Sequence, residues 1–385
     1  MATYIYMALT FAAVAIATYL LTPRIERWAR QRQLLQLPGE ERRVHTSPTP
    51  RIGGVAIYVA VMLGFALTFV LPIGRENNPQ GAQAGVQEAW RVALMMIGAT
   101  LVFAVALWDD IRSLPALPRL LVQFGAAAIV ILPRLFSASD ETSYGILISG
   151  FNLPQQLISL LHLPLKPGSI NTVEISHPAL WLAIILTFFW IVGMTNLMNF
   201  IDGLDGLAAG VTLISGLVLF LRTFALGQNT IAFLPLILVA AMIGFLPYNF
   251  NPARIFMGDG GAMFLGYCLA VISFIGGAKL ATALLVLGVP ILDATWLAIY
   301  RISHKRSPLS ADRLHLHQRL LDMGFSQRQV VFFFYAVSGG FGALGLLLED
   351  RLLKFVALLL MSLLLVALLI YISRREFDRR KVEKS

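Results

Sequence analysis

Long, nearly uninterrupted apolar segments constrain this chain more than any other feature of its sequence. A helix that crosses a bilayer needs about 20 mostly apolar residues, and we count eleven runs near that length; two of them, 118–134 and 261–276, are short, so ten spans is the alternative. The runs are 3–21, 53–73, 91–108, 118–134, 179–197, 207–225, 231–247, 261–276, 279–299, 329–348 and 352–373. The sequence therefore predicts an all-α polytopic membrane protein with one integral domain over residues 1–385.

The charge composition agrees with this fold class. Only 13% of residues are charged, against about 25% in soluble domains. The net charge of +9 would suit a nucleic-acid partner. However, basic residues of membrane proteins gather in cytoplasmic loops, so we expect membrane lipid as a partner and no nucleic acid.

The distribution of Lys and Arg predicts the orientation. With eleven spans, the odd-numbered connections and the tail carry 22 of the 30 basic residues. Loops rich in Lys and Arg face the cytoplasm. The N-terminus is then outside, the C-terminus is cytoplasmic, and 374–385 is a basic cytoplasmic tail. On the outer side, the connection 135–178 holds two β-like stretches, 144–149 and 170–175, which predict a small external hairpin.

Five aspartates stand at predicted span ends on the cytoplasmic side. They are Asp109, Asp110, Asp202, Asp205 and Asp259. An acidic group at the bilayer centre costs about 2.5–3.5 kcal/mol, so span ends are the tolerable location. Their convergence on one face, in a chain with only 21 acidic residues, indicates a divalent-cation site.

Each aspartate has a structural alternative. Asp109 and Asp110 could form an ordinary solvated helix end; on a helix the two diverge by about 100°, so one can face a metal and the other a substrate. Asp202 and Asp205 stand three apart, which puts both on one helical face together with Asn199. A plain Asp-Gly turn is the alternative there.

The segment 249–261 leads into the eighth run and joins Asp259 to two further candidates. Asp259 resembles a helix N-cap, although a glycine-rich helix start also favours phosphate. Phe256 could stack on a nucleobase or simply pack. Arg254 could pair with phosphate or with lipid headgroups.

Two basic segments complete the candidate residues. The ninth connection contains Arg313, His315, His317 and Arg319. The histidines could bind a metal, bind an anion as imidazolium, or lie in a solvated loop. The neighbouring arginines favour the anion site. The first connection ends in a proline-rich segment from His45, for which a basic membrane anchor is the alternative.

Taken together, these segments resemble the polyprenyl-phosphate N-acetylhexosamine-1-phosphate transferases. The matching pieces are the His-x-x-Pro-Thr-Pro-Arg-x-Gly-Gly segment from His45, the Asp109-Asp110 pair, Asn-Phe-x-Asp-Gly-x-Asp-Gly from Asn199, Phe-Met-Gly-Asp from Phe256, and the His-Leu-His segment. They occur in family order over residues 45–319. The first piece is closer to the undecaprenyl-phosphate GlcNAc-1-phosphate branch than to the phospho-MurNAc-pentapeptide translocase branch.

The resemblance implies a set of roles. Asp109 or Asp110 would activate the lipid phosphate, and Asp259 would ligate Mg²⁺, or Mn²⁺ in its place. Nucleotide-binding residues would be Asn199, Asp202, Asp205 and Phe256. Diphosphate- and sugar-binding residues would be His45, Arg313, His315, His317 and Arg319. The substrates would be a UDP-sugar donor and a polyprenyl phosphate acceptor, in a bacterial cytoplasmic membrane, and a homodimer is a family-level expectation.

Two departures from the family and two rival functions qualify these roles. Gln318 stands where many members have a third histidine, and Arg119 where many have lysine. The pentapeptide translocase is the rival with the same chemistry. A cation-coupled transporter is the rival of another class, for which Asp293, inside the ninth run, is the one matching carboxylate. Asp293 could instead pair with Arg301 or border the site.

Overall fold

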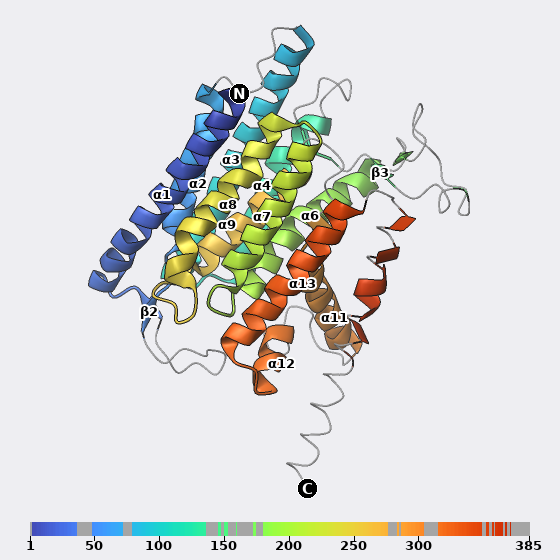
Figure 1. The fold of residues 1–385 in the computed structure, drawn as a ribbon. Helices are drawn as coiled ribbons and strands as arrows, with labels where there is room; N and C mark the ends of the chain where they lie inside the picture. The colour runs from blue at the N-terminus through green and yellow to red at the C-terminus, as the bar shows by residue number, and fades with distance from the viewer. Residues whose placement is uncertain are drawn as a thin grey trace.

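The computed structural model describes a nearly all-helical chain (Figure 1). The described residues are 2–36, 48–71, 79–135, 145–147, 150–152, 159, 172–174, 180–275, 283–284, 286–303, 315–348 and short helical pieces between 352 and 370. His45, Arg313 and the basic tail 374–385 lie outside them, so the roles expected for these residues stay predictions.

Helix is found in each of the first ten predicted runs. The helices are α1 Ala2–Gln31, α2 Gly54–Val70, α3 Pro79–Ile111, α4 Ala116–Leu135, α6 Leu180–Ile201, α7 Leu207–Ala225, α8 Asn229–Asn249, α9 Gly258–Ile272, α11 Gly288–Ser303 and α13 Gln327–Leu347, together with the short α12 Leu316–Asp322. Within the described residues, seven helices are long and apolar enough to cross a membrane, and α2 and α9 are apolar but shorter. The fold class is confirmed as a multi-pass helical membrane protein, whereas the count of eleven and the orientation stay predictions.

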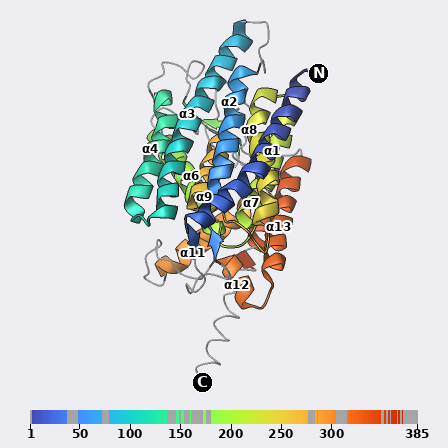
Figure 2. The ribbon, with the colours of Figure 1, turned by 90° about the vertical axis from the view of Figure 1, so that its left-hand side faces the viewer.

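The short helix α9 is the centre of the bundle. Every residue of α9 except Asp259 is buried, and it packs against α3, α6 and α2. Helix α8 packs between α7 and α1 on the neighbouring side, as the two perpendicular views show (Figures 1 and 2). A helix that is enclosed by others does not have to span the full hydrocarbon thickness in contact with lipid, which explains how so short a helix serves as the core.

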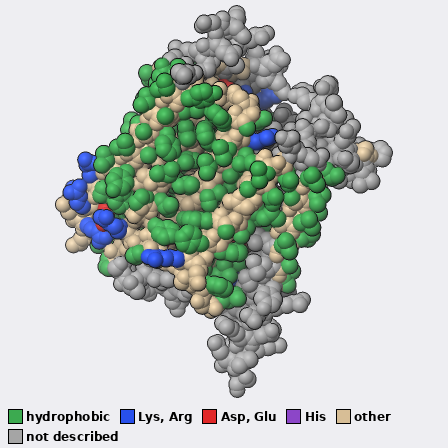
Figure 3. Space-filling model, viewed as in Figure 1, with side chains coloured by type: hydrophobic (Ala, Val, Ile, Leu, Met, Phe, Trp, Pro, Cys, Tyr) green, Lys and Arg blue, Asp and Glu red, His purple; other side chains and the backbone are tan. Residues whose placement is uncertain are grey.

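The outer surface of the bundle is apolar. Hydrophobic side chains cover the middle of the face in Figure 3, and basic side chains lie at its rim. Exposed leucine, isoleucine, phenylalanine and tryptophan side chains recur along α1, α3, α4 and α6. An apolar band with a charged rim is the pattern expected of a surface in contact with lipid.

The strands form two small sheets. Strands β3 (Gly150–Asn152) and β4 (Thr172–Glu174) pair antiparallel, with Phe151 opposite Val173. This confirms strand pairing within 135–178, although the first strand begins just after the predicted stretch 144–149. The second sheet, which was not predicted, joins β1 (Leu35–Gln36) to β2 (Thr49–Pro50).

Strand β2 and the residues that follow it bind the start of the central helix α9. The Phe256 amide donates to the Pro50 carbonyl at 2.8 Å, and the amides of Gly53 and Gly54 donate to the carbonyls of Phe256 and Met257 at 2.9 and 2.8 Å. These bonds hold the N-terminal ends of α2 and α9 together. As a result, Arg51 is placed beside the first turn of α9.

Candidate active site at one end of the bundle

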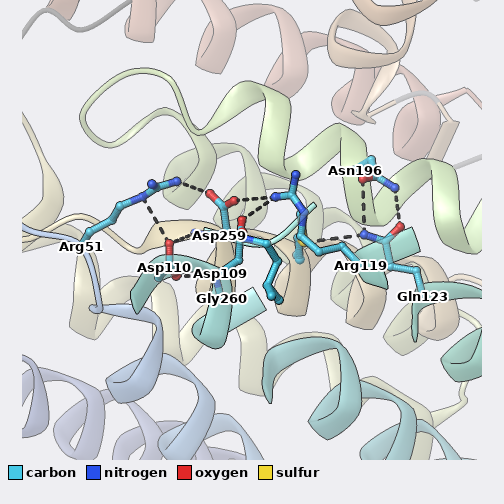
Figure 4. Close-up of polar contacts among 10 residues, drawn as sticks. Arg51, Asp109, Asp110, Arg119, Gln123, Asn196, Asp259 and Gly260 are labelled. Carbon is cyan, nitrogen blue, oxygen red and sulfur yellow. Dashed lines mark hydrogen bonds and ion pairs between the residues drawn. The ribbon is translucent and has the colours of Figure 1, made fainter. Parts of the chain in front are cut away.

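Three aspartates and two arginines form a charged network at the bundle end that carries β2 (Figure 4). Asp109 and Asp110 stand at the C-terminal end of α3, and Asp259 in the first turn of α9. Arg51 follows β2, and Arg119 stands in the first turn of α4. Three distant parts of the chain, namely the segment after β2, the α3–α4 junction and the start of α9, therefore meet at one point.

Asp259 is the centre of the network. Arg51 Nη2 donates to its Oδ1, and Arg119 Nη1 lies 3.2 Å from its Oδ2. In Figure 4 the two arginines reach Asp259 from opposite sides. The N-cap of α9 is Met257, which makes no side-chain cap, so the expectation that Asp259 is a helix N-cap is wrong. Its side chain is turned toward cations rather than toward its own helix.

The two adjacent aspartates have different surroundings, as their divergence on a helix predicts. The Asp110 side chain is fully buried; its oxygens accept from the amides of Asp259 and Gly260 at 2.9 and 2.8 Å, and Arg51 Nε lies 3.2 Å away. Asp110 therefore satisfies amides at the start of α9 that have no partner within the helix. Gly258, at φ +70°, permits this approach, because a Cβ there would lie 2.6 Å from Asp110 Oδ2.

Asp109 points toward the other arginine. Its Oδ2 lies 2.5 Å from Arg119 Nη1, and its Oδ1 accepts from the Leu114 amide at 2.6 Å. The carboxyl groups of Asp109 and Asp259 are also within hydrogen-bond reach of each other. The solvated helix-end alternative is therefore wrong for this pair, since both side chains are engaged inside the network.

The Asp202 segment is a turn and not a helix. Helix α6 ends at Ile201, and Gly206, at φ +78°, caps α7. The expected single helical face for Asn199, Asp202 and Asp205 is therefore wrong. A left-handed residue interrupts the helix there, as the Asp-Gly alternative allows.

The two aspartates of this turn consequently separate. Asp202 is influenced electrostatically by Arg51 and Asp259, and desolvation raises its pKa well above the ordinary value although Arg51 acts in the opposite sense. Asp205 is buried, and its Oδ2 accepts from the Asn251 side chain and from the Ala253 amide, both at 3.0 Å. Asp202 thus belongs to the charged network, whereas Asp205 holds the loop that precedes α9.

Three further candidate residues differ in how they meet the network. The Asn199 side chain hydrogen-bonds the Asp259 carboxyl group. Phe256 is half-buried, with its backbone joined to Pro50 and Gly53, and its expected stacking on a nucleobase stays a prediction. Arg254 pairs with Glu26 of α1 at 3.0 Å, and its expected pairing with phosphate or lipid headgroups stays a prediction.

The histidine segment folds back onto the same turn. His315 caps α12 with an extended backbone, and the rings of His315 and His317 are nearly parallel, with centroids 5.7 Å apart. A Cβ on Gly203 would lie 2.6 Å from His317 Nε2. Tertiary packing therefore brings α12 to the Asp202 turn.

The buried position of His317 affects its charge. Its side chain is 1% exposed, and burial, aided by the neighbouring His315, lowers its pKa to about 4. His317 is therefore neutral at pH 7, so the solvated-loop alternative is wrong for it and an imidazolium role is not supported. Arg319, expected at the diphosphate, is 3% exposed and points inward.

Sequence reasoning missed most of the pairings in this network. Arg51 was noted only as part of a motif and Arg119 only as a departure from the family, yet both bind Asp259. One helical turn after Arg119, Gln123 exchanges amide hydrogen bonds with Asn196 of α6 at 2.6 and 3.3 Å. The i, i+4 spacing of Arg119 and Gln123 was the available signal, because it puts both on one face of α4.

The oxygen-rich surroundings of Asp259 suit a hard cation. The carboxyl groups of Asp259 and Asp109 lie within hydrogen-bond reach of each other, and the Asn199 amide donates to Asp259. Among the described residues, no three Asp, Glu, His or Cys side chains are grouped so as to hold a metal by themselves. Mg²⁺ characteristically uses one or two carboxylates together with substrate phosphates, so this donor set fits it, with Asp259 as the expected ligand.

Comparison with known proteins places this geometry in context. Residues 92–277 match the model of glycosyl transferase family 4. The chain is 30% identical to a probable undecaprenyl-phosphate N-acetylglucosaminyl 1-phosphate transferase of Bacillus subtilis, over 90% of this chain and 86% of that protein. It is 32% identical to a decaprenyl-phosphate N-acetylglucosaminephosphotransferase of Mycolicibacterium smegmatis, over 89% and 83%. It is 26% identical to a phospho-N-acetylmuramoyl-pentapeptide-transferase of Staphylococcus aureus, over 89% and 98%.

Proposed function

The chain belongs to glycosyl transferase family 4, the polyprenyl-phosphate sugar-1-phosphate transferases, and from that premise we propose that it transfers N-acetylglucosamine-1-phosphate from UDP-GlcNAc to undecaprenyl phosphate. The products are undecaprenyl-diphospho-GlcNAc and UMP. The reaction would initiate synthesis of a cell-envelope glycan. Family membership favours this transfer reaction over a cation-coupled transporter.

The observation that carries the proposal is the convergence of Asp109, Asp110 and Asp259 around Arg51 and Arg119 at one end of an apolar bundle. A lipid phosphate lies at the membrane surface with its chain in the bilayer, so its reaction partner must be bound at a helix end. The arginines there supply charge for phosphate groups, and Arg is well suited to bind them with two parallel hydrogen bonds.

In the proposed step, an oxygen of the lipid phosphate attacks the β-phosphorus of the UDP-sugar. A new P–O bond forms to the lipid phosphate, and the bond from the β-phosphorus to the bridging oxygen breaks. UMP leaves with that electron pair. Positioning and charge neutralisation carry most of the catalysis in phosphoryl transfer, which a network of this kind supplies.

Different residues of the chain would bind the acceptor phosphate, the donor diphosphate and the metal ion. Arg119, beside Asp109, would hold the acceptor phosphate near the end of α3, and Arg51 would face the donor diphosphate. Asp259 would hold Mg²⁺, which when bound would neutralise phosphate charge and favour the leaving group. Arg51 keeps its positive charge throughout, because the carboxylates of Asp259 and Asp110 outweigh burial and hold its pKa above the ordinary value.

The test uses full-length protein in lipid nanodiscs that contain undecaprenyl phosphate, with UMP release measured for several UDP-sugars. We expect release with UDP-GlcNAc and Mg²⁺, loss of release with EDTA, and recovery when Mg²⁺ or Mn²⁺ is restored. Preference for UDP-MurNAc-pentapeptide would support the translocase alternative instead. No release from any UDP-sugar by correctly folded protein would disprove the proposed function.

The Asp259→Asn variant tests the metal ligand separately. Its Mg²⁺ requirement should rise strongly, because one carboxylate supplies the protein's main oxygen ligand to the cation. The exposed Asp322→Asn variant is the matched control and should keep the wild-type Mg²⁺ dependence. An unchanged Mg²⁺ titration in Asp259→Asn would remove Asp259 from that role.

A further inference from the structure

Asp293 is a buried carboxylate that the proposed reaction does not use. It lies in the middle of α11, and its side chain is 4% exposed. A buried carboxylate is costly unless it is paired and hydrogen-bonded. Its surroundings therefore identify what it does.

Both oxygens of Asp293 bind the start of α12. Oδ2 lies 3.0 Å from His315 Nδ1, and Oδ1 accepts from the Leu316 amide at 2.8 Å. The sequence left open whether Asp293 pairs with Arg301 or borders the site. The structure joins Asp293 to the histidine segment, 22 residues further along the chain.

This contact determines which ring nitrogen of His315 faces the protein interior. A carboxylate only accepts hydrogen bonds, so the hydrogen on the ring lies on Nδ1. In the neutral ring Nε2 then carries a lone pair, and in the protonated ring Nε2 carries the second hydrogen. In both states the edge of the ring opposite Asp293 is left for a ligand.

Contacts with two other rings also fix the position of the His315 ring. His315 lies 5.7 Å from the ring of Phe200 and 5.7 Å from that of His317. Phe200 directly follows Asn199, whose side chain hydrogen-bonds the Asp259 carboxyl group. Ring contacts and the Asp293 contact together hold His315 beside the last turn of α6, next to the charged network.

From these contacts we infer that Asp293 is a positioning residue for His315 and fixes the ring so that Nε2–H of its protonated form donates to the diphosphate of the nucleotide-sugar donor. The inference rests on the proposed function for the identity of the ligand, but the orientation of the ring does not depend on it. Asp293 itself touches no substrate. Its effect on the reaction passes through His315.

The first experiment measures the ring directly. Full-length protein with ¹⁵N-labelled histidine is placed in nanodiscs, and NMR identifies the protonated nitrogen of the neutral His315 ring, assigned among the six histidines by comparison with His315→Ala. We expect Nδ1–H in the wild type. In Asp293→Asn the amide donates to Nδ1 while its oxygen accepts from Leu316, so the hydrogen should move to Nε2.

The second experiment is kinetic. Asp293→Asn should raise the KM for UDP-GlcNAc by about tenfold, the loss expected for one misplaced charged hydrogen bond, and leave the KM for undecaprenyl phosphate unchanged. The double variant Asp293→Asn/His315→Ala should be no worse than His315→Ala alone, because the two residues act as one unit. Asp322→Asn, which removes an exposed carboxylate from the end of α12, is the matched control.

The outcomes separate the inference from the proposed function. Nε2–H in the wild type, or no change of the protonated nitrogen in Asp293→Asn, would overturn the inference whatever the enzyme does. Equal increases in both KM values, or fully additive effects in the double variant, would show that Asp293 serves only stability and would also overturn it. Absence of transferase activity in the wild type would instead count against the proposed function, and the NMR result would still decide the orientation.

Discussion

Arg119 Nη1 lies 2.5 Å from Asp109 Oδ2, although the two residues belong to different helices, α4 and α3. The same nitrogen lies 3.2 Å from Asp259 Oδ2. One guanidinium thus joins the two carboxylates that the sequence assigned separately to the lipid phosphate and to the metal. Both contacts are made by a single terminal nitrogen of the guanidinium.

We therefore expect Arg119 to be required as a cation. Arg119→Ala leaves Asp109 and Asp259 without this partner and should lower kcat for UMP release by about 10²-fold or more, the loss typical of removing one preorganised charge contact. Arg119→Lys keeps the charge but reaches one carboxylate less well, so its loss should be smaller. The exposed Arg112→Ala serves as a control and should keep the wild-type rate; equal effects of Arg112→Ala and Arg119→Ala would contradict this prediction.

The two adjacent aspartates should respond differently to neutral substitution. Asp110→Asn removes an acceptor from amides at the start of α9 and should lower both activity and the midpoint of thermal unfolding, with a loss of about 1–3 kcal/mol for a buried group left unsatisfied. Asp109→Asn should lower activity with a much smaller change in the unfolding midpoint, since its side chain is partly exposed. Thermal unfolding in detergent and steady-state kinetics are measured on both variants. The same unfolding midpoint in both variants would refute the structural role of Asp110.

The buried His317 should make stability depend on pH. Its pKa of about 4 in the folded state lies below the ordinary 6.5, so between these values the unfolded chain binds the additional proton. The stabilising contribution is therefore complete above pH 6.5 and is lost as the pH falls toward 4. For a shift of this size the loss is on the order of 3 kcal/mol.

His317→Gln, which does not titrate, tests this pH effect. The unfolding midpoint of the wild type should fall between pH 7.5 and pH 5 by more than that of the variant. His304→Gln, which removes a histidine elsewhere in the sequence, controls for the loss of a histidine as such. Parallel pH curves for wild type and His317→Gln would argue against a buried neutral His317.

The amide pair of Gln123 and Asn196 should behave as a coupled unit. Gln123 is 3% exposed, and either single change to leucine leaves one amide without its side-chain partner inside the bundle. Each single variant should lose about 1 kcal/mol of unfolding free energy, and the double variant should lose less than the sum of both. A double-mutant cycle on unfolding midpoints measures this coupling, and strictly additive losses would show that the pair contributes nothing.

The fold class and most helix positions followed from the sequence because both depend on local composition. The predicted run 207–225 coincides with α7, Leu207–Ala225, since polar Asp-Gly turns end the apolar segment on one side and Gly227 follows it on the other. Within 135–178, strand β4 lies in the predicted stretch 170–175, whereas β3 begins just after the predicted stretch 144–149. The sequence predicted helix lengths less well. For example, α1 extends to Gln31, because arginines that end an apolar run do not end a helix.

The site was predicted as a set of residues but not as a geometry. Asp109, Asp110, Asp202 and Asp259 were identified from their positions at span ends, and all four belong to one charged network. Asp205 was grouped with them, yet it binds Asn251 and the loop before α9. Its three-residue spacing from Asp202 indicated a shared helical face, but α6 ends at Ile201 and residues 202–206 form a turn.

The sequence by itself determined a membrane-embedded helical chain with most of its candidate carboxylates at helix ends. Apolar surface is costly in water and charge is costly in lipid, and both costs act on each segment independently of the others. The tertiary structure alone decided which charges meet: Arg51 and Arg119 on Asp259, and Asp293 on His315. Hydrogen bonds and ion pairs act over a few ångströms between segments up to 228 residues apart. Such partners depend on how the helices pack around α9, which no local pattern in the chain specifies.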